Sequence, residues 1–157
     1  MPKITPCFWF DNNAEDALNF YASVFKSARI LSKSYYGDEG PGPKGMLLTA
    51  TLQIEGQEFM VLNGGPYDPF THAISFIINC ETQDEVDWYW DNLLAGGQPE
   101  QCGWLKDKFG LSWQIVPTIL GRLLQDKDTL KSGRVMQAML QMVKIDIDSL
   151  KRAYEQE

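Results

Sequence analysis

An internal repeat with a spacing of 68 residues constrains the fold more than any other feature of this chain. Each half contains a short apolar strand, an acidic residue near a helix start, an aromatic pair and a further apolar residue. The equivalent positions are Phe8 and Phe76, Asp16 and Asp84, Phe20-Tyr21 and Trp88-Tyr89, and Phe25 and Leu93. The repeat therefore predicts two pseudo-symmetric modules, each built from one strand, one helix and three further strands.

Local patterns place the elements of each module. In the first, we expect a strand over 4–10, a helix that begins after Asn12 or Asn13, and strands over 29–36, 46–54 and 58–62. A Gly- and Pro-rich loop over 37–45 and a tight hairpin at Glu55-Gly56 separate these strands. In the second, we expect a strand over 73–80, a helix over 83–95, and strands over 101–105 and 112–116. Helices are predicted over 117–124, over 129–143 and from Ser149, which follows Asp148.

Composition excludes several classes of function. The formal net charge is −7 over 157 residues, so the chain would repel a phosphate backbone, and we expect no nucleic-acid partner. The apolar runs are too short to span a bilayer, and the N-terminal residues show no secretory signal, so we expect no membrane association. Cys7, Cys80 and Cys102 are odd in number and form no C-x-x-C pair, which favours a reduced, cytoplasmic protein.

Two segments of the second half carry a family resemblance. The run Asp107-Lys-Phe-Gly-Leu-Ser-Trp-Gln-Ile-Val-Pro117 and the tail that begins Met139-Leu-Gln-Met resemble the PhnB-like, or 3-demethylubiquinone 3-methyltransferase-like, branch of the vicinal oxygen chelate superfamily. That superfamily includes glyoxalase I, bleomycin-resistance proteins and extradiol dioxygenases. The resemblance implies an α+β, glyoxalase-like fold in which two βαβββ modules (about 1–63 and 71–117) form a curved mixed sheet. The domain would cover 1–117, with a C-terminal helical extension over 118–157.

The resemblance also implies where a divalent metal would bind. In metal-dependent relatives the ligands come from the first and last strands of each module, and these positions hold Ile4, Met60, His72 and Gln114 here. Catalytic metal sites typically need about three His or carboxylate ligands, whereas this set offers one imidazole and one amide. Glu58 is a possible substitute on the strand of Met60. We therefore favour no cofactor, while a divalent metal held by His72, Gln114 and Glu58 stays the alternative.

Strand alternation predicts the lining of a metal-free pocket. Residues two apart on a strand share a face, so we expect an apolar hollow with a few polar groups, which is typical of small-molecule sites. Core packing and ligand contact are about equally good interpretations of Phe8 and Phe76. The candidate pocket residues are Ile4, Phe8, Phe10, Met60, His72, Ile74, Phe76 and Gln114.

Two classes of function remain open at this stage. The first is a metal-free, small-molecule-binding protein of the glyoxalase or bleomycin-resistance type, with an unknown ligand. The second is a lyase, isomerase or dioxygenase of the same superfamily that uses either a divalent metal or His72 as the catalytic base. Relatives of this size commonly pair modules and the C-terminal helices offer an apolar face, so we also expect a symmetric homodimer. Ile4 and Met60 stand where metal ligands would be, and this favours the metal-free binding protein over the enzyme.

Overall fold

The computed structural model describes residues 2–66 and 68–156. The chain divides into two compact units, Met1–Pro69 and Phe70–Glu157. Each unit contains one four-stranded mixed sheet and one helix in the order βαβββ, and the second unit continues into three more helices. This confirms the predicted α+β fold with two βαβββ modules and C-terminal helices.

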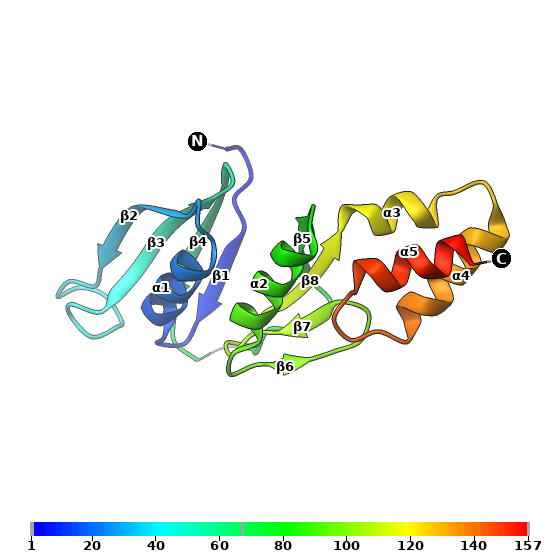
Figure 1. Ribbon diagram of the computed structural model, residues 1–157. Coiled ribbons are helices and arrows are strands. Elements are labelled where there is room, and N and C mark those ends of the chain that lie inside the picture. Colours follow the sequence, from blue (N-terminus) through cyan, green and yellow to red (C-terminus); the bar gives the residue numbers. More distant parts are fainter. Residues whose placement is uncertain (1, 67, 157) are drawn as a thin grey trace. The chain divides into compact units, whose positions relative to one another are not determined.

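The first unit consists of β1 (Cys7–Phe10), α1 (Ala14–Val24), β2 (Arg29–Tyr35), β3 (Leu47–Ile54) and β4 (Gln57–Asn63). The strand order is β1-β4-β3-β2, with β1 parallel to β4 and the other two pairs antiparallel. Glu55 and Gly56 form the predicted tight hairpin, both with positive φ (49° and 81°). Helix α1 covers one face of this sheet (Figure 1).

The core of the first unit lies between α1 and the sheet. Alternate strand residues are buried, and they meet the apolar stripe of the helix. The buried strand residues are Phe8, Phe10, Leu47, Ala50, Leu52 and Val61, and the buried helix residues are Ala14, Ala17, Leu18, Tyr21 and Val24. The stripe agrees with the helix predicted from the sequence.

Asn63, the last residue of β4, caps the start of α1 by a hydrogen bond. The local cap residue Asn13 makes no side-chain hydrogen bond to the helix. Instead, Asn63 Oδ1 accepts from the Ala14 N–H (2.8 Å), and Asn63 Nδ2 donates to the Leu47 carbonyl oxygen (3.0 Å). The Asn63 carbonyl oxygen accepts from the Tyr36 hydroxyl (2.5 Å). One buried side chain thus satisfies an N–H group that a helix start leaves without a partner.

The second unit begins with β5 (Ser75–Cys80), α2 (Gln83–Leu94), β6 (Gln98–Pro99), β7 (Trp104–Lys106) and β8 (Ser112–Pro117). Its strand order, β5-β8-β7-β6, repeats the topology of the first sheet. Helix α2 has a local cap, because Thr82 Oγ1 accepts from the Glu85 N–H at 3.2 Å. The buried residues Val86, Trp90 and Leu93 of α2 pack over the sheet.

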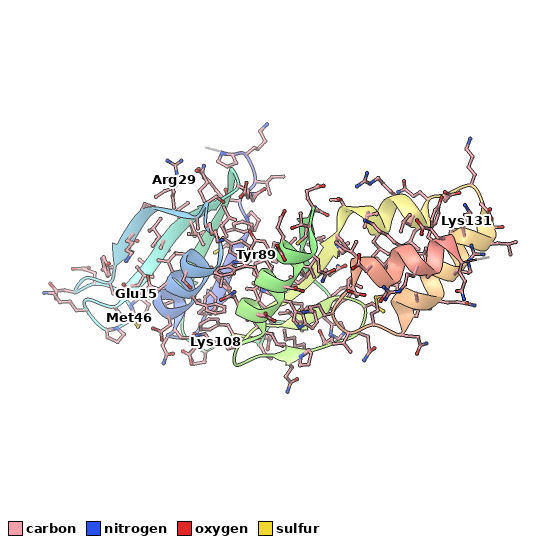
Figure 2. The ribbon with its side chains drawn as sticks, in the orientation of Figure 1. Glu15, Arg29, Met46, Tyr89, Lys108 and Lys131 are labelled. Atoms are coloured by element: carbon pink, nitrogen blue, oxygen red, sulfur yellow. The ribbon has the colours of Figure 1, made fainter. Side chains whose placement is uncertain are left out.

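Three helices complete the second unit: α3 (Thr118–Leu124), α4 (Thr129–Leu140) and α5 (Ile147–Glu155). They enclose a cluster formed by Leu120, Val135, Ile145 and Leu150. Figure 2 shows Lys131 on this bundle, where its ammonium group lies 4.8 Å from the centre of the Tyr154 ring. The bundle is therefore packed internally by apolar contacts from all three helices.

The segment between α4 and α5 also contacts the rest of the second unit. The Cys102 and Gly103 N–H groups donate to the carbonyl oxygens of Met142 and Val143, both at 2.8 Å. Gln83 Nε2 donates to the Ile145 carbonyl oxygen (3.1 Å). The α4–α5 segment is thus hydrogen-bonded to the turn before β7 and to the first residue of α2.

Several predicted boundaries need correction. The strands expected from residues 4 and 73 begin at Cys7 and Ser75. The expected strand over 101–105 is a turn followed by β7, and the short β6 was missed because Pro99 lowers strand propensity. The last helix begins at Ile147 because Asp146, and not Asp148, accepts from the Ser149 N–H. The domain boundary at residue 117 stays a prediction.

Candidate functional site

Each sheet has one face against its own helix and one face that we call the distal face, on the other side of the sheet from α1 or α2. Strand register assigns residues to these faces, because directly paired residues point the same way. In the second sheet the buried pair Leu105 and Trp113 belongs to the helix face, together with Ile115. The adjacent residues Ser112 and Gln114 therefore belong to the distal face.

Gln114 occupies the middle of the second distal face. Its Nε2 donates to Ser75 Oγ on the neighbouring strand at 2.9 Å. The register pairs Gln114 with Ile77 on β5 and with Trp104 on β7. An amide and a hydroxyl thus lie between an exposed aliphatic side chain and a half-buried indole, the mixture expected of a small-molecule surface.

A cation lies beside this group on β7. Lys106 is half-buried and pairs with Ser112 across the sheet. The chain after α2 approaches β7 closely at Gly97, where an added Cβ would lie 2.0 Å from the Lys106 carbonyl oxygen. Only glycine fits this approach, which brings β6 into register with β7.

Asp107 sets the turn that leads into β8. The carboxylate is buried, and its Oδ1 accepts from the N–H groups of Phe109 (2.9 Å) and Leu111 (3.1 Å). Its Oδ2 accepts from Trp113 Nε1 at 2.9 Å. These bonds fix the start of β8, and therefore the position of Ser112 and Gln114, from the helix side of the sheet.

The first sheet also has a distal face, and it is richer in hydroxyl and amide groups. Ser34 and Thr49 share a hydrogen bond of 2.7 Å across β2 and β3, and Arg29 Nη2 donates to Gln53 Oε1 at 2.7 Å. Figure 2 shows Arg29 at the start of β2. The register adds one further set of residues to this face, namely Cys7, Trp9, Glu58, Met60 and Leu62.

The structure divides the predicted pocket residues between different faces. Phe8 and Phe10 are buried against α1, and Phe76 contacts Trp113 on the helix face, with ring centres 5.8 Å apart. These three side chains therefore lie on the helix faces of their sheets, opposite the distal faces. Met60 and Gln114 do lie on distal faces. Their role in binding stays a prediction.

Three other predicted residues lie outside the strands. Ile4 precedes β1 and is 81% exposed, and Ile74 precedes β5 and is 70% exposed. His72 is exposed in the turn before β5, so strand register does not assign it to a face. The candidate base is thus freely accessible, and its catalytic role stays a prediction.

The cysteines differ in their surroundings. Burial raises the pKa of the Cys80 thiol to about 12, and the Glu85 and Glu81 carboxylates add to the increase. Burial also raises the pKa of Cys7, although part of this residue is exposed. A raised pKa lowers the fraction of thiolate, so neither group is suited to act as a nucleophile.

The predicted metal ligands do not fit a divalent cation. Gln114 is a neutral amide that offers one oxygen, His72 is an imidazole in an exposed turn, and Met60 and Ile4 provide no hard donor atom. Within the described residues, no group of three or more His, Cys, Asp and Glu side chains could hold a metal ion. The donor set is thus poorer than metal sites typically need.

Sequence reasoning missed Ser75, Trp104 and Lys106. Their signal is the register of the β7–β8 hairpin, because Lys106 and Trp104 alternate with the buried Leu105 and so share a face with Gln114. The hairpin could not be placed from sequence alone, since β7 has only three residues. Ser75 required the parallel register between β5 and β8.

Comparison with known proteins gives one family match. The profile of the family described as 3-demethylubiquinone-9 3-methyltransferase matches residues 2–116. No curated protein matches the chain by sequence. None of the described helices is long and apolar enough to cross a membrane.

Solved structures give further matches. A putative 3-demethylubiquinone-9 3-methyltransferase, a PhnB protein from Bacillus cereus, is 36% identical, with a TM-score of 0.70, and the match covers 74% of this chain and 100% of that one. A Pseudomonas aeruginosa protein is 20% identical, with a TM-score of 0.63 and coverage of 74% and 98%. The fosfomycin resistance protein FosX from Listeria monocytogenes, complexed with Mn(II) and sulfate, is 15% identical, with a TM-score of 0.54 and coverage of 78% and 97%. The resemblance predicted from the sequence is thereby confirmed.

Proposed function

The chain belongs to the 3-demethylubiquinone-9 3-methyltransferase family, of the vicinal oxygen chelate superfamily, and from this premise we propose that it binds a small molecule without a metal. The binding surface in this proposal is the distal face of the second sheet around Gln114. The glyoxalase and bleomycin-resistance type of fold supports a ligand-binding role, while the ligand itself is left open.

The hydrogen bond from Gln114 Nε2 to Ser75 Oγ carries this proposal. Gln114 is a neutral amide at the position where the resemblance implies a carboxylate ligand. The bond to Ser75 fixes the orientation of this amide. Gln114 Oε1 and the Ser75 hydroxyl hydrogen are left to meet a ligand. Such groups orient a small molecule by hydrogen bonds and provide no anionic ligand for a metal.

We do not extend the proposal to methyl transfer. Common methyltransferases bind their adenosyl cofactor at a Gly-rich turn between a strand and a helix. The Gly-rich segment of this chain, over 37–45, connects β2 to β3 instead. Gly40 and Gly42 pack against the Tyr36 ring, where an added Cβ would lie 2.6 Å and 2.7 Å from ring atoms.

The first test is calorimetric titration of metal-stripped protein with Mn²⁺, Ni²⁺ and Zn²⁺, in parallel with the His72→Ala variant. We expect no binding that depends on His72. Micromolar or tighter binding that the variant loses would contradict the metal-free proposal. It would favour the alternative, a divalent-metal-dependent lyase, isomerase or dioxygenase. A structure of the same fold, that of FosX, is complexed with Mn(II).

The second test is a thermal-shift screen with small aromatic and apolar molecules, because a ligand that binds only the folded state raises the melting temperature. We expect at least one compound to stabilise the protein and to lose its effect in Gln114→Leu. Gln125→Leu, which changes an exposed glutamine directly after α3, is the matched control. Stabilisation that survives in Gln114→Leu would move the binding site away from the second distal face.

The proposal includes a homodimer. Met136 and Leu140 on α4, with Val143 just beyond it, are exposed at helical spacing and form an apolar surface. We expect sedimentation equilibrium to give twice the monomer mass, and Leu140→Glu to shift the protein toward monomer. A wild-type monomer at high protein concentration would refute this part.

We place the protein in the cytoplasm, because all three of its cysteines are free. Rapid alkylation under denaturing conditions should label three thiols per chain in protein taken from cells. Disulfide-bonded protein in the same assay would indicate an oxidising compartment.

A further inference from the structure

The second distal face contains two charged or polar side chains whose hydrogen-bonding groups are buried without a partner. Within residues 2–66 and 68–156, such side-chain atoms are Glu100 Oε1 and Ser112 Oγ. Burying a polar atom without a hydrogen bond costs free energy, so each case calls for an explanation. Both atoms belong to the same face of the same sheet, which points to a common cause.

Backbone pairing places Glu100 on that face. Glu100 directly follows β6, and its N–H donates to the Trp104 carbonyl oxygen at 2.9 Å, so antiparallel pairing continues one residue beyond β6. Gln98, two residues earlier, pairs with Lys106. Glu100 therefore shares the face of Trp104 and Lys106, and it lies diagonally across from Lys106.

The opposite charges of this face do not neutralise each other. Glu100 and Lys106 occupy diagonal positions, where long side chains can meet, yet neither takes part in an ion pair within the part of the chain that the structure describes. A carboxylate and an ammonium group held near each other but unpaired can bind a ligand that carries both complementary charges. The hydroxyls of Ser75 and Ser112 can add hydrogen bonds to an anionic ligand group next to Lys106.

We infer that the second distal face binds a small zwitterion with an aromatic side group, whose ammonium group contacts Glu100 and whose carboxylate contacts Lys106. The ring of the ligand would pack on Trp104 and Ile77, the two apolar side chains that flank Gln114. This inference rests on the proposed function and narrows its ligand class. Since Glu100 Oε1 and Ser112 Oγ are covered in the structure, a neighbouring side chain must change rotamer when the ligand binds.

Four probes separate the contributions of the two charges in calorimetric titrations of the full chain. L-phenylalanine carries both charges, 2-phenylethylamine only the amine, 3-phenylpropanoate only the carboxylate, and 3-phenylpropan-1-ol neither. Glu100→Gln should weaken binding of phenylalanine and phenylethylamine about tenfold or more, the effect of losing a charge-assisted hydrogen bond, and leave phenylpropanoate unchanged. Lys106→Gln should weaken phenylalanine and phenylpropanoate and leave phenylethylamine unchanged.

Matched surface variants are the controls for charge alone. Lys108→Gln changes an exposed lysine two residues from Lys106, and Glu39→Gln changes an exposed glutamate in the first unit. Both should bind every probe as the wild type does. Circular dichroism verifies the fold of all four variants. Replacing Glu or Lys by Gln changes the size of the side chain only slightly.

Two outcomes would overturn the inference. One is binding of the charged probes with equal affinity by wild type, Glu100→Gln and Lys106→Gln. The other is no binding of any charged probe. If the neutral alcohol still binds and Gln114→Leu abolishes that binding, the proposed function stands while the zwitterion inference fails. If the alcohol does not bind and the aromatic and apolar screen gives no hit that Gln114→Leu abolishes, the proposed function fails as well.

Discussion

The two units share one topology but stabilise it in different ways. In the first, α1 receives its N-terminal cap from Asn63 on β4, so the sheet itself holds the helix. In the second, α2 is capped locally by Thr82, and additional support comes from the segment between α4 and α5. A repeated fold can thus keep its strand order while its stabilising contacts come from different parts of the chain.

The difference follows from the size of the two sheets. Strands β2 and β3 have seven and eight residues, whereas β6 and β7 have two and three. A short hairpin has few ladder hydrogen bonds, and two-stranded ribbons are marginal by themselves. The hydrogen bonds from Cys102 and Gly103 to the α4–α5 segment compensate for this. We therefore expect the second unit to depend on its C-terminal helices.

The largest effect should come from Ile145→Ala. Ile145 is fully buried in the C-terminal cluster, and loss of such a side chain costs about 4 kcal/mol of unfolding free energy through lost burial and a cavity. Hydrogen exchange measured by mass spectrometry should show faster exchange in residues 70–156 and unchanged exchange in the first unit. Leu130→Ala, at a 75% exposed position on α4, is the control. Equal loss of protection in both units would contradict the proposed division of support.

Asn63→Ala should have the next largest effect, now in the first unit. The substitution leaves the Ala14 N–H and the Leu47 carbonyl oxygen without this partner, at a cost of about 3 kcal/mol. Faster hydrogen exchange should appear in α1 and β3. Asn92→Ala removes an exposed amide from α2 and should cost less than about 0.5 kcal/mol. Similar losses for the two variants would show that Asn63 is not a special cap.

Thr82→Ala should destabilise the second unit by about 1 kcal/mol, the usual cost of losing a local helix cap. Urea unfolding, followed by exchange of the α2 amides, measures the change. The loss of unfolding free energy in Thr82→Ala should be clearly smaller than the loss in Asn63→Ala. If Thr82→Ala proved the more damaging of the two, the contrast between a local and a distant cap would be refuted.

The smallest effect concerns pH. The pKa of Asp87 is lowered, chiefly by hydrogen bonds from Lys144 and Gln83, and the Lys144 Nζ lies 2.9 Å from Asp87 Oδ1. Because the folded-state pKa is lowered, the contact contributes its full stability at pH values above the unfolded-state pKa of about 3.9. This contribution is lost as the pH falls through the folded-state pKa. Because the pair is partly exposed, it contributes less than about 1 kcal/mol. Asp87→Asn should reduce the loss of stability between pH 5 and about pH 3, as measured by urea unfolding; an unchanged pH profile would assign the loss to other groups.

Periodicity, turn residues and the internal repeat predicted two modules, and the family resemblance implied their glyoxalase-like arrangement. The helix stripes, the hairpin at Glu55 and the loop over 37–45 are local features, and the repeat linked them into two modules. The faces of the strands were not predictable in the same way. Phe8, Trp9 and Phe10 are all aromatic, so alternation gives no indication of which side meets α1.

The candidate site depends even more on non-local information. Gln114 was found through its place in a motif, but Ser75, Trp104 and Lys106 reach it only through strand pairing. Glu100 carries no sequence signal, since an acidic residue before a turn is most simply a solvated one. Its single buried oxygen is a property of the folded sheet.

The position of Asn63 has a consequence for synthesis on the ribosome. Strand β4 lies between β1 and β3, so β1 has no partner within its own unit until β4 has been made. The same residue that ends β4 also completes the start of α1. A nascent chain that has not yet released Asn63 would therefore expose an unpaired strand and an uncapped helix, and the first unit should form in one step once that residue emerges.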